Sequence, residues 1–115
     1  MGNVYNWTEY TTDFINKNID KKYINNYSKT FIINKVELYI EYCRINKQKI
    51  RRERIKLILD YEVYKFSGYL DKNAPKNNHK RIAKFLNIFF NDEKHIYREF
   101  LRQIRLNKKE VIKWV

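Results

Sequence analysis

The apolar residues of this 115-residue chain recur at steps of three and four, which is the period of an amphipathic helix. Alternation of apolar and polar residues is never sustained, and the chain has only two glycines and one proline. Helices are therefore favoured over strands. The pattern predicts an all-α fold, a compact bundle of four to five helices. Residues 1–106 are expected to form a single helical domain, and residues 107–115 a tail or the start of a linker.

Five helices are expected, over about 5–17, 20–46, 50–69 and 76–91 and from 92 onward. Asp20 and Asp92 are candidate N-caps, and Pro75 suits the first turn of the fourth helix. Glu62 interrupts the apolar face of the third helix, and the pattern offers no reason for it. The residues expected to face inward are Trp7, Tyr10, Phe14 and Ile15; Ile32, Val36, Tyr39, Ile40 and Cys43; Ile55, Ile58, Leu59 and Phe66; Ile82, Phe85, Leu86, Phe89 and Phe90; and Ile96, Phe100 and Ile104.

Charge is distributed unevenly along the chain. There are 25 lysines and arginines against 13 acidic residues, a net charge of +12. Residues 1–43 contain five residues of each sign, so the whole excess lies in 44–115. The positive electrostatic potential of such a region attracts polyanions, of which nucleic acid is the commonest inside a cell. The alternative is a highly charged surface that serves only solubility.

The basic residues form three clusters, which are the candidate DNA-binding residues. The first lies within 44–54, at the junction of the second and third helices, the second opens the fourth helix, and the third forms a stripe on the fifth. Their members are Arg51, Arg52 and Arg54; Lys76, Asn77, Asn78, His79, Lys80, Arg81 and Lys84; and Arg98, Arg102, Arg105 and Lys109.

The second cluster is the strongest candidate for entry into a DNA groove. Asparagine and arginine are the residue types that read adenine and guanine edges, and a helix N-terminus binds phosphate through its free amides. Lys76, Lys80 and Lys84 lie four residues apart and share one outer face. Most of the ten tyrosines lie at core or boundary positions, which makes stacking on unpaired bases the weaker interpretation.

The sequence contains no complete catalytic centre, so an enzyme, a cofactor and a small-molecule substrate are not expected. A single cysteine, Cys43, and two distant histidines give no metal site. No apolar run could span a membrane, and no secretory signal is apparent, so an intracellular location is expected. The adjacent carboxylates Asp60/Glu62 and Asp92/Glu93 are interpreted as surface or capping groups.

Most of the chain resembles the core-binding domain of tyrosine recombinases, especially that of archaeal-virus integrases. The resemblance lies in residues 7–18, 23–43, 55–73, 73–91 and 96–111. The resemblance implies a helical module that binds double-stranded DNA without cutting it, because the catalytic half of a recombinase is not in this chain. It places the DNA contacts on the fourth helix, at Lys76, Asn78, His79, Lys80, Arg81 and Lys84.

Three other interpretations remain open. Residues 81–104 are typical of a helix-turn-helix, in which Lys94, His95, Arg98 and Arg102 would read DNA. A small virus-encoded protein that binds an acidic protein partner has the same size and charge. An RNA-binding bundle would prefer structured RNA over duplex DNA.

Overall fold

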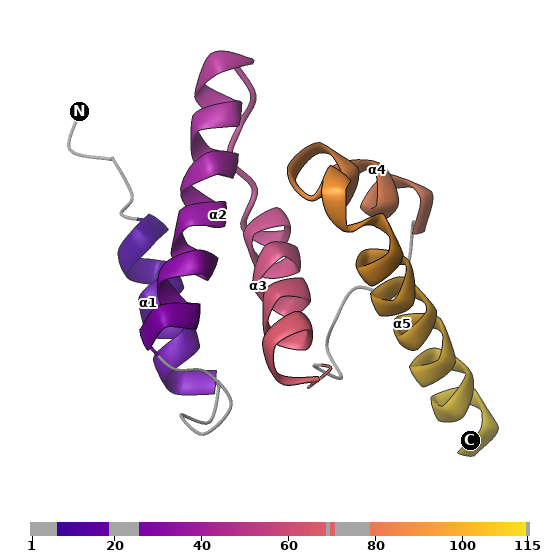
Figure 1. The fold of residues 1–115 in the computed structure, drawn as a ribbon. Helices are drawn as coiled ribbons and strands as arrows, with labels where there is room; N and C mark the ends of the chain where they lie inside the picture. Colours follow the sequence, from indigo (N-terminus) through magenta and orange to yellow (C-terminus); the bar gives the residue numbers. More distant parts are fainter. Residues whose placement is uncertain (1–6, 19–25, 69, 71–78, 115) are drawn as a thin grey trace. The chain divides into compact units, whose positions relative to one another are not determined.

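A computed structural model describes residues 7–18, 26–68, 70 and 79–114. These residues form five α-helices and no strand (Figure 1), which confirms the predicted all-α class. The helices are α1 (Trp7–Asn18), α2 (Asn26–Ile45), α3 (Arg52–Ser67), α4 (His79–Phe89) and α5 (Lys94–Trp114), with a 3-10 helix, η1 (Asn91–Glu93), before α5. The chain divides into an N-terminal unit, Met1–Leu59, and a C-terminal unit, Asp60–Val115, so that α3 contributes to both.

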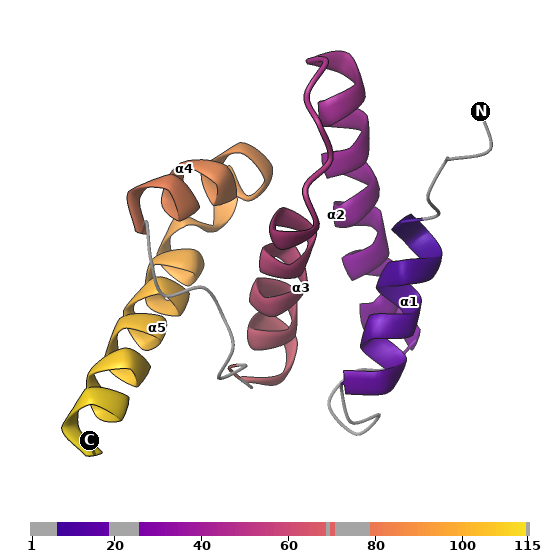
Figure 2. The same cartoon turned by 180° about the vertical axis from the view of Figure 1, so that it is seen from behind.

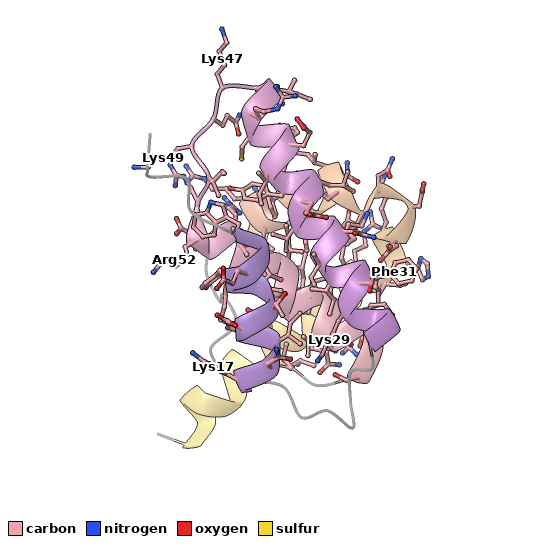
Figure 3. The ribbon with its side chains drawn as sticks, turned by 90° about the vertical axis from the view of Figure 1, so that its left-hand side faces the viewer. Lys17, Lys29, Phe31, Lys47, Lys49 and Arg52 are labelled. Carbon is pink, nitrogen blue, oxygen red and sulfur yellow. The ribbon has the colours of Figure 1, made fainter. Side chains whose placement is uncertain are left out.

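In the N-terminal unit, α1 lies beside α2 (Figures 1 and 3). The inward face of α2 is as predicted, except that Ile40 is only half-buried. On α1 the predicted face is shifted. Ile15 and Thr11 are buried, whereas Trp7, Tyr10 and Phe14 are half-buried. Thr11 can occupy the core because its hydroxyl donates to the Trp7 carbonyl oxygen at 2.7 Å.

The loop between α2 and α3 is held tightly to the end of α2. The Gln48 amide donates to the Cys43 carbonyl at 2.9 Å and the Lys47 amide to the Arg44 carbonyl at 3.4 Å, the two bonds of a Schellman cap. Lys47 adopts φ 52°, a left-handed conformation that glycine usually supplies. The Arg51 amide then donates to the Tyr39 hydroxyl at 3.0 Å. This loop is therefore well ordered by hydrogen bonds, and it presents exposed cations.

In the C-terminal unit, α4 lies across the first turns of α5 (Figures 1 and 2). The predicted face of α4 is buried at Ile82, Phe85 and Leu86, followed by Phe90. Tyr61 of α3 packs edge-on against Phe90 and Phe100, with ring centroids 4.7 and 5.3 Å away. The prediction that Phe66 faces inward is wrong, because 39% of it is exposed.

Helix α5 extends further than expected. Its buried face consists of Tyr97, Phe100, Leu101 and Ile104, whereas Ile96 is half-buried. The helix continues to Trp114, through most of the segment that we expected to be a tail or linker. The predicted starts of the second and fourth helices, at 20–25 and 76–78, lie outside the described residues.

The prediction that Asp60 and Glu62 are surface groups is also wrong. They are 3% and 1% exposed. Lys65 Nζ lies 2.6 Å from Glu62 Oε1 and 2.8 Å from Glu93 Oε1, and the Tyr61 hydroxyl donates to the same Glu93 oxygen at 2.9 Å. Burial lowers the Lys65 pKa, but the two carboxylates raise it by more, so the ammonium form is favoured. The pairing with Lys65 explains how Glu62 can interrupt an apolar face.

Candidate nucleic-acid interface

The outer faces of α4 and α5 form an open groove within the C-terminal unit. Apolar residues of both helices turn toward the core, which leaves their polar faces outward. The groove has a volume of about 560 Å³, and we call it the α4–α5 groove. Five cations line it: Lys80, Arg81 and Lys84 from α4, and Lys94 and Arg98 from α5. The structure therefore brings together parts of the second and third basic clusters.

Three further residues line the groove, and one of them adds a hydrogen-bond donor. They are Ala83, Asn87 and the largely buried Tyr97. The Tyr97 hydroxyl donates to Asn87 Oδ1 at 3.0 Å. This bond uses the hydroxyl proton and the amide oxygen, and leaves the Asn87 amide NH₂ as a donor. The polar groups of the groove are therefore mainly donors, although most of its lining surface is apolar.

Among the described residues that line the groove there is no carboxylate. Two acids of the same unit are engaged with other side chains. Glu93 accepts from Tyr61 and Lys65, and Glu99 accepts from Arg102 at 2.7 and 2.9 Å. Hydrogen bonds from Arg102 and Gln103 lower the pKa of Glu99 to about 2. Glu93 and Glu99 thus each hold a cation that does not line the groove.

The candidate residues separate into distinct groups. Lys80, Arg81, Lys84 and Arg98 line the groove. Arg102 and Arg105 are exposed on α5 but do not line it, and His79 is half-buried at the start of α4. Lys76, Asn77 and Asn78 lie outside the described residues, and nothing is described of the Lys109 side chain.

Arg51, Arg52 and Arg54 belong to the N-terminal unit and form a separate basic region. Arg51 is exposed and lies 3.8 Å from the exposed Glu53. Arg52 is also exposed, and its guanidinium lies 5.7 Å from the centre of the Tyr10 ring. Arg54 is half-buried. Arg51 and Arg52 thus each lie near another side chain.

Sequence reasoning missed Asn87 and Tyr97 as groove residues and placed Lys94 only in the helix-turn-helix alternative. The spacing contains a signal for them. Asn87 lies seven residues after Lys80 and three after Lys84, and Tyr97 lies three after Lys94, so each pair shares a helix face. The groove itself requires α4 and α5 to be placed against each other, which the spacing alone does not give.

The described residues hold no group of three or more histidine, cysteine or acidic side chains placed to bind a metal ion. None of the described helices combines the length and hydrophobicity needed to cross a membrane.

No protein-family model, no curated protein and no solved structure matches the chain. The resemblance to recombinase core-binding domains therefore stays a prediction from the sequence, as does the helix-turn-helix alternative.

Proposed function

We propose that the chain is a non-catalytic module that binds double-stranded DNA through the α4–α5 groove. The observation that supports this most is the convergence of five cations from two helices on one groove that no carboxylate lines, among the residues described there. A groove of this kind favours a ligand that carries several negative charges and many acceptor oxygens. Phosphodiester backbones meet both requirements.

The basic surface is larger than a site for a single small anion. Arg98, Arg102 and Arg105 follow one another at steps of four and three, so they share one face of α5. From Arg98 to Arg105 the helix advances about 10 Å. Cations thus continue beyond the groove along α5, as contact with successive phosphates requires. The choice of duplex DNA among polyanions comes from the family resemblance.

Fluorescence anisotropy at several salt concentrations tests the proposal, with a random DNA duplex, a single strand and an RNA hairpin as probes. If all five groove cations neutralise phosphates, the logarithm of the association constant for the duplex falls with the logarithm of the salt concentration with a slope of about −4.5. The variant Lys80→Ala/Arg81→Ala/Lys84→Ala keeps two of them, and its slope falls to about −2.

A matched control removes the same charge elsewhere. Lys29, Lys35 and Arg44 all lie on α2, and their replacement by alanine also removes three positive charges. We expect this variant to keep most of the duplex affinity and the slope. Equal losses in both variants would show a response to net charge alone. Tighter binding of the RNA hairpin than of the duplex would overturn the proposal in favour of an RNA-binding bundle. Absence of binding to all three probes at low salt would also overturn it, and an acidic protein partner would then become the leading explanation.

A further inference from the structure

A row of aromatic side chains follows one face of α1 in the N-terminal unit. Trp7, Tyr10 and Phe14 are spaced by three and four residues, so they project from the same side of the helix. All three are half-buried, which leaves part of each ring accessible. The Trp7 and Tyr10 rings meet edge to face, with centroids 5.7 Å apart and planes at 85°. The Trp7 and Tyr10 rings are therefore in contact with each other.

A row of cations on α3 lies over the aromatic row. Arg52 Cζ is 5.7 Å from the centre of the Tyr10 ring, and Lys56 Nζ is 5.5 Å from the centre of the Phe14 ring. Arg52 and Lys56 are one helical turn apart, so the two rows run side by side. Both residues precede Asp60 and belong to the same unit as α1. We call these five residues, Trp7, Tyr10, Phe14, Arg52 and Lys56, the α1–α3 strip.

Further cations lie at both ends of the strip. Figure 3 shows Lys49, with the strip's own Arg52, near one end of α1 and Lys17 at the other. All three are exposed. The exposed acids of α1, Glu9 and Asp13, lie about 100° and 60° around the helix from Tyr10, both on one side of the row. Both acids lie on the solvent-facing side of the row, because the opposite side carries the buried Thr11 and Ile15. An anionic chain would therefore pass along α3, where Arg52 and Lys56 lie.

Aromatic rings beside cations are the combination that recognises single-stranded nucleic acid. Unpaired bases stack on aromatic faces and on guanidinium planes, while cations bind the backbone that joins them. The Arg52 guanidinium lies over the Tyr10 ring, and the residue as a whole is exposed to solvent. A base that reaches this surface can stack on the guanidinium plane. A duplex, whose bases are already stacked, cannot use this arrangement.

We propose that the α1–α3 strip is a second nucleic-acid site, which binds single strands by stacking bases on Trp7, Tyr10 and Arg52. The site is separate from the α4–α5 groove and does not depend on the function proposed for that groove.

Quenching of Trp7 fluorescence by a short oligothymidine tests the proposal. The chain has one other tryptophan, Trp114, and the substitution Trp114→Phe leaves Trp7 as the only indole. We expect oligothymidine to quench Trp7, because stacking brings a base against the ring. An abasic oligonucleotide of equal length supplies the same charges without bases and should leave the fluorescence nearly unchanged.

Substitutions locate the binding. Tyr10→Ala is expected to weaken oligothymidine binding about tenfold, since stacking contributes about 1–3 kcal/mol per base. Tyr10→Phe keeps the ring and should bind like wild type, and Arg52→Gln provides a second variant that leaves the aromatic row intact. Circular dichroism checks that each variant is folded. The matched control is Phe31→Leu, because Phe31 is an exposed aromatic residue on the side of α2 away from α1 (Figure 3).

The groove variant Lys80→Ala/Arg81→Ala/Lys84→Ala separates the two sites. We expect this variant to lose duplex binding, while oligothymidine still quenches its Trp7 fluorescence. Oligothymidine binding without quenching, equal binding by Tyr10→Ala, Arg52→Gln and wild type, or loss of oligothymidine binding in the groove variant would each overturn the proposal.

Discussion

The α4–α5 groove and the α1–α3 strip are both basic, but their cations have different neighbours. In the groove, five cations line an open surface with an amide donor and no carboxylate among the lining residues. In the strip, Arg52 and Lys56 lie over aromatic rings. The first arrangement suits a phosphate backbone and the second suits a backbone with unstacked bases. The neighbours of a cation, and not its charge alone, thus indicate its ligand.

The largest expected effect concerns the ion pairs that Lys65 forms with Glu62 and Glu93. Lys65→Met leaves Glu62 buried without its ammonium partner, and we expect a loss of about 3–5 kcal/mol in the free energy of unfolding. Urea denaturation measures it. The double variant Lys65→Met/Glu62→Gln removes the unpaired charge and should recover much of the loss. A loss below about 1 kcal/mol for Lys65→Met would indicate a pair no stronger than one on the surface.

The N-terminal unit should lose stability at alkaline pH through Tyr39. Burial raises the pKa of its hydroxyl from 10.0 to about 12, although the bond from the Arg51 amide acts in the opposite direction. Folding favours the protonated phenol and therefore stabilises the folded state. This stabilisation is fully present below pH 10 and is lost as the pH rises toward 12.

We therefore expect Tyr39→Phe to show a shallower fall in stability over this range than wild type. Chemical denaturation at a series of pH values measures the difference. At neutral pH the same substitution should cost about 1 kcal/mol, because the Arg51 amide loses its acceptor. If stability fell equally with pH in Tyr39→Phe and wild type, the alkaline loss of stability could not be attributed to Tyr39.

Lys47→Gly is expected to stabilise the protein by about 0.5–1 kcal/mol, because glycine adopts a left-handed conformation without the steric cost that a lysine side chain meets. The shift of the urea midpoint measures it. Oligothymidine binding through the strip should change little, since Lys47 is not a member of it. A lower midpoint would show that the lysine side chain contributes more to stability than its backbone conformation costs.

The smallest effect concerns the edge of the groove. Glu99 holds Arg102 by two hydrogen bonds, so Glu99→Gln should release this arginine toward bound DNA. If Arg102 then contacts one further phosphate, the salt slope for the duplex steepens by about 0.9. An unchanged slope in the anisotropy series would mean that the DNA does not extend along α5 as far as Arg102.

Periodicity predicted the helices well because burial in this chain follows helical spacing closely. Ile32, Val36, Tyr39 and Cys43 lie on the predicted face of α2, and Ile82, Phe85 and Leu86 on that of α4. The errors fall where a side chain depends on a specific partner. Hydropathy places Glu62 on the surface because its pattern contains no information about Lys65, three residues later, or about Glu93, which is distant in sequence.

The candidate sites were predictable only in part. The basic clusters identified Lys80, Arg81, Lys84 and Arg98, because charge and spacing can be read directly. The pairing of Arg102 with Glu99, three residues earlier, is one that helical spacing allows, but the basic clusters alone do not indicate it. That Arg98 lines the groove depends on the packing of α4 against α5, which spacing does not give. Spacing also assigned Trp7, Tyr10 and Phe14 to the core. The polar Thr11 takes the buried position instead, through a local hydrogen bond that hydropathy does not weigh.

Amide NMR of the full chain during titration with a short DNA duplex tests the central proposal most directly, because it reports where the ligand binds. We expect the largest chemical-shift changes at residues 79–84 of α4 and 94–98 of α5, with small changes along α1. Shifts concentrated in the α2–α3 loop or along α1, or no shifts at low salt, would contradict the assignment of the α4–α5 groove as the duplex-binding site.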